Sequence, residues 1–216
     1  MSLRERFERD GIVFPLPVLT AGEAAHYAGT VASHLTAKKD DIRDLHMRYD
    51  WARQLATHPA VAAAAREVAG GEVAVWGTLL LSKPPQSEEY VPWHQDGAYR
   101  TFEPDESLSA WIALSDSTAA AGCMRVIAGS HREVRPHREG EDAHSVLRGN
   151  RYIEGVAEAD AIDVVLRPGE MSIHHLFLVH GSRVNRATHA RTGFIVRFLR
   201  AGTAWNGPLL RVRGGA

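Results

Sequence analysis

The stretch Trp93-His94-Gln95-Asp96-Gly97 holds the side chains of this chain that are best suited to bind a metal. If the stretch is extended, His94 and Asp96 point to the same face of a strand, because they are two residues apart. An imidazole and a carboxylate aimed at one point suit a divalent metal of intermediate softness. A second histidine would complete the two-histidine, one-carboxylate set that holds Fe(II) in non-haem enzymes. For so short a motif, a core or surface role without a metal is the alternative.

A third ligand must come from far along the chain, and four later histidines are candidates: His174, His175, His180 and His189. His180 ends an apolar run and is followed by Ser182 and, eleven residues on, by Arg191. Arg191 opens the next apolar run, so its guanidinium could return beside the metal and bind the far carboxylate of a dicarboxylic acid. The Ser182 hydroxyl could add one hydrogen bond. A hydrogen-bonded place within a strand is the alternative for His174 and His175, which are adjacent and therefore face opposite ways, and His189 lies in a polar turn.

The elements that must position these residues are mostly strands. Thr20 and Glu23 have capping-box spacing and predict a helix to about residue 36; residues 44–57 and 59–69 read as further helices. Apolar runs bounded by turn residues predict strands over 73–81, 108–114, 122–127, 162–166, 171–179 and 193–199. Residues 132–147 are polar and read as an exposed loop or lid. Helices first and strands afterwards predict an α+β, mainly β chain built on an antiparallel barrel or jelly roll.

Composition narrows the class of protein. The chain has 216 residues, 44% of them hydrophobic, and a net charge of −1, which gives no argument for nucleic acid or a membrane surface as partner. We expect a single domain, with a helical part over 1–71 and a β core over 72–200. One cysteine, Cys123, excludes an intramolecular disulfide, and the charged N-terminus leads into no signal-like apolar segment. These features predict a cytoplasmic protein, monomeric or homodimeric.

Several motifs together resemble the phytanoyl-CoA dioxygenase family of Fe(II)/2-oxoglutarate-dependent oxygenases. They occur in family order at 83–85 (Lys-Pro-Pro), 93–97, 109–114, 122–127, 129–131 (Gly-Ser-His), 167–170 (Arg-Pro-Gly-Glu) and 180–182 (His-Gly-Ser), the last followed by Asn185 and Arg191. The resemblance implies a double-stranded β-helix (a cupin-like jelly roll) with flanking N-terminal helices. It also implies an enzyme that uses Fe(II), 2-oxoglutarate and O2.

The resemblance implies a role for individual residues. His94, Asp96 and His180 would hold Fe(II); Arg191 and Ser182 would bind the 2-oxoglutarate carboxylate. Trp111 and Leu79 match family positions that contact this cosubstrate. Residues expected near the substrate pocket are Trp93, Gln95, Tyr99, Lys83 and Arg132.

Asp96 also bears on the outcome of the reaction. Related halogenases have a small residue in place of this carboxylate, so Asp96 favours hydroxylation of an unactivated C–H bond, with release of succinate and CO2, over chlorination. Desaturation, ring closure and epimerisation stay open. The expected substrate is a small molecule, and a natural-product tailoring step is the preferred role. The alternative is a cupin-like metal-dependent isomerase or a small-molecule binding module. Arg191 with Ser182 separates the two, because only a 2-oxoglutarate user needs that anion anchor.

Overall fold

The computed structural model of the protein describes residues 1–38, 41–99, 107–147 and 151–212. Its helices are α1 (Leu3–Asp10), α2 (Ala21–Ala37), α3 (Asp50–Ala56) and α4 (Pro59–Ala69), with short 3-10 turns η1 (Leu45–Met47), η2 (Asp96–Tyr99), η4 (Ser130–Arg132) and η6 (Glu158–Asp160). The strands are β1 (Ile12–Pro17), β2 (Val73–Lys83), β3 (Val91–His94), β4 (Ser107–Ala113), β5 (Met124–Val126), β6 (Arg138–Glu139), β7 (Arg151–Tyr152), β8 (Ile162–Val164), β9 (Glu170–His175), β10 (His180–Ser182), β11 (Arg191–Arg200) and β12 (Leu210–Arg211).

The local signals place two of the three predicted helices correctly. Thr20 and Glu23 form the predicted capping box at the start of α2. α4 starts with Pro59 and ends at Gly70, whose φ of 71° is the left-handed conformation that favours glycine. The predicted helix over 44–57 is wrong in its first half. Asp44 has a φ of 51° and its amide donates to the Thr78 carbonyl of β2, so this segment follows the sheet edge until α3 begins.

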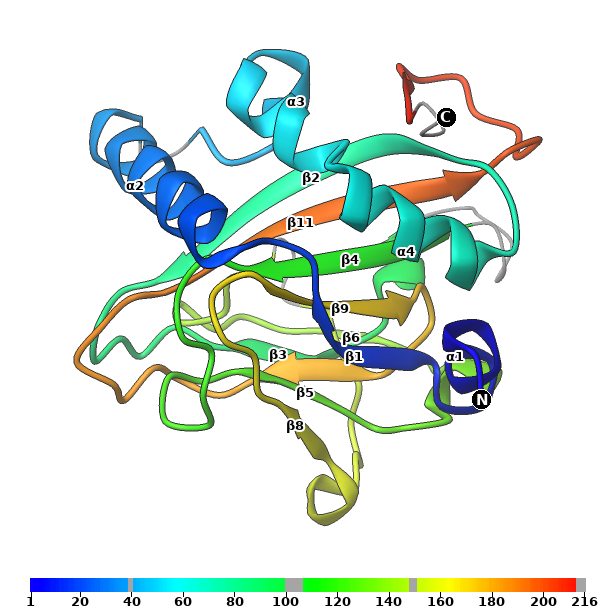
Figure 1. Ribbon diagram of the computed structural model, residues 1–216. Coiled ribbons are helices and arrows are strands. Elements are labelled where there is room, and N and C mark those ends of the chain that lie inside the picture. The colour runs from blue at the N-terminus through cyan, green and yellow to red at the C-terminus, as the bar shows by residue number, and fades with distance from the viewer. Residues whose placement is uncertain (39–40, 100–106, 148–150, 213–216) are drawn as a thin grey trace.

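Two antiparallel sheets form the predicted jelly roll. The larger sheet has the strand order β1-β9-β4-β11-β2-β12 and the smaller has the order β3-β10-β5-β8. Strands that are neighbours in space are distant in sequence, since β11 lies between β2 and β4. In Figure 1 the helices α2, α3 and α4 lie along the outer side of the large sheet, and the small sheet lies on its other side.

The alternation of side chains along β11 divides the interior into two cores. Phe194, Val196 and Phe198 are fully buried against the helices. Ile195, on the opposite face, packs with residues of both sheets, among them Trp111 and Val126. A charged residue on this inner face therefore points into the space between the sheets.

The predicted strand over 171–179 is wrong in its second half. β9 ends at His175, and the chain then turns, with the Leu178 amide donating to the His175 carbonyl. Residues 176–179 carry the chain from the large sheet to the small one, where β10 begins at His180. As a result, His174 and His180 approach the interior from different sheets. The segment 132–147 is mostly irregular, as predicted, apart from η4 and the short pairing of β6 with β7.

No helix in the described ranges combines the length and the apolar character needed to cross a membrane.

Candidate active site

His94 and His180 are directly opposite each other on β3 and β10, with ring centroids 4.1 Å apart. In each ring Nδ1 lies 2.9 Å from a backbone carbonyl oxygen, that of Pro92 for His94 and that of Leu178 for His180. A carbonyl oxygen only accepts, so Nδ1 carries the hydrogen and donates it. This backbone contact turns the Nε2 side of each ring toward the same point, the arrangement that orients histidine ligands in metalloproteins.

Asp96 reaches the same point by a different route from the predicted one. β3 ends at His94, and Asp96 opens the 3-10 turn η2 rather than continuing the strand. Its Oδ1 nevertheless lies 3.6 Å from His94 Nε2, and one ligand atom from each of His94, Asp96 and His180 falls within 4.8 Å of the others. Gly97 makes this turn possible, because a Cβ there would come within 2.4 Å of the Phe177 ring.

The charges at this point suit a cation. Burial alone would raise the pKa of Asp96, but contacts with His174 and His94 and the charge of Arg197 outweigh it and hold the pKa well below its ordinary value. Burial, together with the neighbouring histidines, lowers the pKa of His180 well below its usual range. The ionised carboxylate of Asp96 and the neutral imidazole of His180 are in the protonation states that metal binding requires.

Arg191 is a buried cation in the same cavity. Its side chain is 3% exposed, its Nε donates to Ser117 Oγ at 3.3 Å, and its Cζ lies 4.2 Å from the centroid of the Trp111 ring. No carboxylate of the described residues pairs with it. Burial lowers the pKa of Arg191 to about 10, so the guanidinium stays charged near neutral pH. An uncompensated buried charge is costly, which indicates that an anion belongs beside it.

The other predicted cosubstrate residues line this cavity too. Leu79, Trp111 and Ser182 are all buried and all contribute to its wall, together with the three candidate metal ligands and Arg191. Trp111 fits because of Gly193, where a Cβ would lie 2.0 Å from the indole ring. The loop that delivers Arg191 is braced by Asn185, whose Nδ2 donates to the carbonyls of Pro84 and His189, both at 2.9 Å.

Lys83 is a second buried cation in this region, although it is not among the cavity-lining residues. Its Nζ donates to the Gly122 carbonyl at 2.8 Å, to Ser182 Oγ at 3.1 Å and to the Arg183 carbonyl. Burial, with the nearby charge of Arg191, lowers the pKa of Lys83 to about 7. Gly122 makes room for the ammonium group, since a Cβ there would lie 2.6 Å from Nζ. Lys83 therefore supports Ser182 from behind rather than facing a substrate.

Three further residues predicted near the substrate are placed elsewhere. Trp93 points away from the cavity because it precedes His94 on the strand, and its Nε1 donates to Glu158. Gln95 is fully buried, and its amide spans the Glu133 and Phe177 carbonyls and the Arg135 amide. Arg132 donates to backbone carbonyls, among them that of Arg9 at the end of α1. Gln95 and Arg132 thus hold backbone segments together. Tyr99 closes η2, and its side chain lies outside the described atoms.

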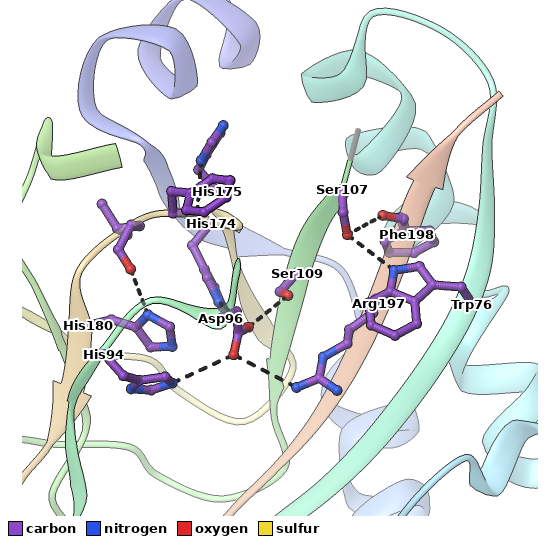
Figure 2. A network of polar contacts seen from close by, with 12 residues as sticks. Trp76, His94, Asp96, Ser107, Ser109, His174, His175, His180, Arg197 and Phe198 are labelled. Atoms are coloured by element: carbon purple, nitrogen blue, oxygen red, sulfur yellow. Dashed lines mark hydrogen bonds and ion pairs between the residues drawn. The ribbon is translucent and has the colours of Figure 1, made fainter. Parts of the chain in front are cut away.

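Three polar residues with no predicted place in the site lie around Asp96, although His174 is among the candidate third ligands and Ser109 begins the motif over 109–114. Arg197, Ser109 and His174 are consecutive register partners across β11, β4 and β9, so they form one row on the sheet. Figure 2 shows all three beside the carboxylate. For Arg197 the signal in the sequence is a charged residue within an apolar run, between Val196 and Phe198. The row can be recognised only once the pairing register of β11, β4 and β9 is known.

The cavity that contains these groups has a volume of about 630 Å³. Besides the three candidate metal ligands, the cavity wall includes two tryptophans, Trp76 and Trp205, whose ring centroids are 5.4 Å apart. Arg197 lies over Trp76, with Cζ 5.5 Å from the ring centroid. His46 adds a buried imidazole whose Nδ1 is 3.0 Å from Thr78 Oγ1. The outer part of the cavity is thus aromatic, with a few fixed polar groups, as in binding sites for small organic molecules.

Comparison with known proteins gives a consistent result. Residues 7–193 match the sequence model of the family described as Phytanoyl-CoA dioxygenase (PhyH). A probable phytanoyl-CoA dioxygenase of Caenorhabditis elegans is 34% identical over 118 residues, which are 50% of this chain and 37% of that protein. This chain therefore spans well under two thirds of that relative.

Two solved structures resemble nearly the whole chain. ThoJ, described as a non-heme monooxygenase in its apo form, has a TM-score of 0.85 at 31% identity, covering 99% of this chain and 84% of ThoJ. The epimerase SnoN, in complex with Fe3+, alpha ketoglutarate and nogalamycin RO, has a TM-score of 0.78 at 27% identity, covering 94% of this chain and 84% of SnoN.

Proposed function

We propose that this chain, which belongs to the phytanoyl-CoA dioxygenase family, is an Fe(II)- and 2-oxoglutarate-dependent dioxygenase that hydroxylates an unactivated C–H bond of a small molecule. One observation carries the proposal. The buried, uncompensated cation of Arg191 lines the same cavity as the His94, Asp96 and His180 cluster. A metal-binding point with a dicarboxylate anchor beside it is what a 2-oxoglutarate user needs, whereas a metal-dependent isomerase or a binding module has no use for the anchor.

The three clustered side chains fit Fe(II). Two imidazoles that donate from Nδ1 to backbone carbonyls, together with one ionised carboxylate, would form the facial set typical of non-haem Fe(II) oxygenases. When bound there, iron with 2-oxoglutarate and O2 supplies oxidative decarboxylation to succinate and CO2 and the oxidation of a substrate C–H bond. The backbone carbonyls of Pro92 and Leu178 hold the two rings so that this geometry exists before a metal enters.

The protein's own groups would position the cosubstrate. Arg191 offers its guanidinium edge to the far carboxylate of 2-oxoglutarate in a paired, charge-assisted contact. The Trp111 ring packs against the face of the guanidinium, and the Ser182 hydroxyl would add a hydrogen bond to the same carboxylate. Leu79 contributes an apolar wall, which excludes water and strengthens the charge interaction. The cosubstrate would therefore lie between a fixed cation and the metal.

The substrate would occupy the outer part of the cavity. Trp76 and Trp205 give flat apolar walls, while Arg197 and His46 give polar contacts that can orient a ring system. The volume of about 630 Å³, shared with 2-oxoglutarate, suits a compact organic molecule. SnoN, which resembles this chain along nearly its whole length, is described with nogalamycin RO bound, and this supports a natural-product tailoring role.

Hydroxylation is preferred over other outcomes for two reasons. Asp96 keeps the carboxylate that chloride would have to replace, and ThoJ is described as a monooxygenase. Epimerisation is the second candidate, because SnoN is described as an epimerase. The products separate them: hydroxylation adds one oxygen atom to the substrate, and epimerisation leaves its mass unchanged.

Anaerobic addition of Fe(II) and 2-oxoglutarate to the full chain tests the proposal. We expect a visible metal-to-ligand charge-transfer band in the wild-type protein, none with Asp96→Ala, and a band with Arg191→Leu only at much higher 2-oxoglutarate concentrations. Arg186→Leu is the matched control, because Arg186 is an exposed arginine paired with Glu88. Absence of the band from the wild type, or an unchanged titration with Arg191→Leu, would overturn the proposal.

A further inference from the structure

His174 is a third imidazole at the centre of the site, and its polar contact there is a distant one with Asp96. The residue is 3% exposed, and both ring nitrogens are buried without a hydrogen-bond partner among the described residues. Buried polar groups are normally satisfied, so an imidazole with two orphaned nitrogens needs an explanation. Beside the candidate metal ligands, the explanation is a role in the site.

The geometry around Asp96 indicates what that role is. His174 Nε2 lies 3.8 Å from Oδ2 of Asp96, and Ser109 Oγ donates to the same oxygen at 3.3 Å. The other oxygen, Oδ1, lies 3.6 Å from His94 Nε2 and 3.9 Å from Arg197. The two carboxylate oxygens therefore face different groups: one faces a candidate metal ligand, and the other faces Ser109 and His174 (Figure 2).

His174 is not itself placed as a ligand. Its nitrogens are not in the group of ligand atoms that lie within 4.8 Å of one another. It is instead the register partner of Ser109, directly across β9 and β4, so that the two side chains reach Asp96 from adjacent strands. Two rigid strands thus support one oxygen of a carboxylate that sits on a short turn.

We infer that His174 is a positioning residue. Together with Ser109 it holds Oδ2 of Asp96, so that the carboxylate offers only Oδ1 to the metal. The inference rests on the proposed function. The metal held by His94, Asp96 and His180 would also have to bind 2-oxoglutarate and O2, so each protein ligand should use a single atom. A carboxylate free to rotate and chelate would occupy a position that a cosubstrate needs.

The test compares His174→Phe, which removes the donor but keeps a planar ring, with His174→Gln, which keeps an N–H donor. Co(II) binding to the full chain, followed by its visible spectrum, reports on both affinity and coordination. Removing an outer partner of a metal ligand typically weakens metal binding by about 10-fold or more. We expect at least that loss and a changed Co(II) spectrum with His174→Phe, and near wild-type behaviour with His174→Gln. His34→Gln is the control, because His34 is a buried histidine outside the cavity wall, with Nε2 2.7 Å from the Asp41 carbonyl oxygen.

Thermal unfolding of the metal-free variants separates positioning from structural support. His174→Phe should lower the melting temperature only slightly, because Ser109 still donates to the same oxygen of Asp96, and His174→Gln should melt close to the wild type. A lowered melting temperature in both His174 variants, or wild-type Co(II) affinity and spectrum with His174→Phe, would overturn the inference. If wild-type protein gives no charge-transfer band with Fe(II) and 2-oxoglutarate, the proposed function fails; if it does and His174→Phe behaves as wild type, only this inference fails.

Discussion

Arg191 and Lys83 are direct register partners across β11 and β2, so a second buried cation lies beside the one that lines the cavity. No carboxylate of the described residues pairs with either. Like charges in adjacent buried positions are unfavourable. One cation lowers this cost by losing its proton easily, since the pKa of Lys83 is about 7, and the other remains charged. The pair forms a positive site that a dianion would stabilise.

Lys83 should make stability depend on pH. Its pKa in the folded protein is about 7, against an ordinary value of 10.5. Between these values the unfolded chain carries a proton that the folded chain lacks, so the free energy of unfolding should rise with pH through this window. Below about pH 7 both states are protonated, and the contribution stops changing. Urea unfolding at several pH values should show this slope in the wild type and a smaller one with Lys83→Met. Equal slopes would show that Lys83 titrates normally.

Arg191 should decide which oxoacids bind. With Fe(II) or Co(II) present, calorimetry should show that the wild type binds 2-oxoglutarate far more tightly than 2-oxobutyrate, which lacks the far carboxylate. Loss of a buried charge pair costs about 2–5 kcal/mol, so Arg191→Leu should lose roughly 30-fold or more in 2-oxoglutarate affinity and most of the discrimination. Arg191→Lys should recover only part, because an ammonium lacks the paired donors. If Arg191→Leu still preferred 2-oxoglutarate over 2-oxobutyrate as strongly as the wild type, another residue would have to bind the far carboxylate.

Gly193 should be essential to the site although it contacts no ligand. A Cβ at this position would lie 2.0 Å and 2.2 Å from two atoms of the Trp111 ring, so Gly193→Ala must displace the indole on which Arg191 rests. We expect a loss of about 1–3 kcal/mol of stability from overpacking, with weaker 2-oxoglutarate binding. Gly22→Ala is the control, because nothing lies within 4 Å of a Cβ in that position of α2. Chemical denaturation of both variants measures the difference, and equal stability would contradict the packing argument.

Gln95 should hold the segment near residues 133–137 against the metal-binding turn. Its side chain bonds to the Glu133 and Phe177 carbonyls and accepts from the Arg135 amide, all in a fully buried position. Gln95→Leu leaves these groups unpaired, at about 1–3 kcal/mol for each buried group. Limited proteolysis should then cut this segment faster than in the wild type, while 2-oxoglutarate should still bind. Unchanged cleavage would mean that other contacts hold the segment.

The sequence allowed much of the site to be predicted, and the reasons are physical. The spacing of His94 and Asp96 is a weak signal by itself, and it gains weight from His180, Arg191 and the motifs in family order. Arg191 was recognisable because a charged residue opens an apolar run after His180. The fold class followed from the order of helical and strand-like segments. Even so, His94 and Asp96 meet through a 3-10 turn and not along one strand.

The remaining features depend on register and on backbone breaks that local patterns do not encode. Arg197, Ser109 and His174 become one row only when β11, β4 and β9 pair as they do. The run over 171–179 is apolar throughout its second half because both sheets bury it, so the crossing between sheets carries no polar signal. Gln95 lies between two candidate ligands, so the sequence suggested a place in the substrate pocket. In the structure its amide instead bonds to buried backbone groups.

Consumption of 2-oxoglutarate tests the central claim most directly. The full chain, loaded with Fe(II) and supplied with isotopically labelled O2, should convert 2-oxoglutarate to succinate and CO2 and place one labelled oxygen atom in the succinate. The reaction should stop with Asp96→Ala and require much more 2-oxoglutarate with Arg191→Leu. If iron-loaded protein forms no succinate, or the succinate carries no label, the chain is not a 2-oxoglutarate-dependent oxygenase.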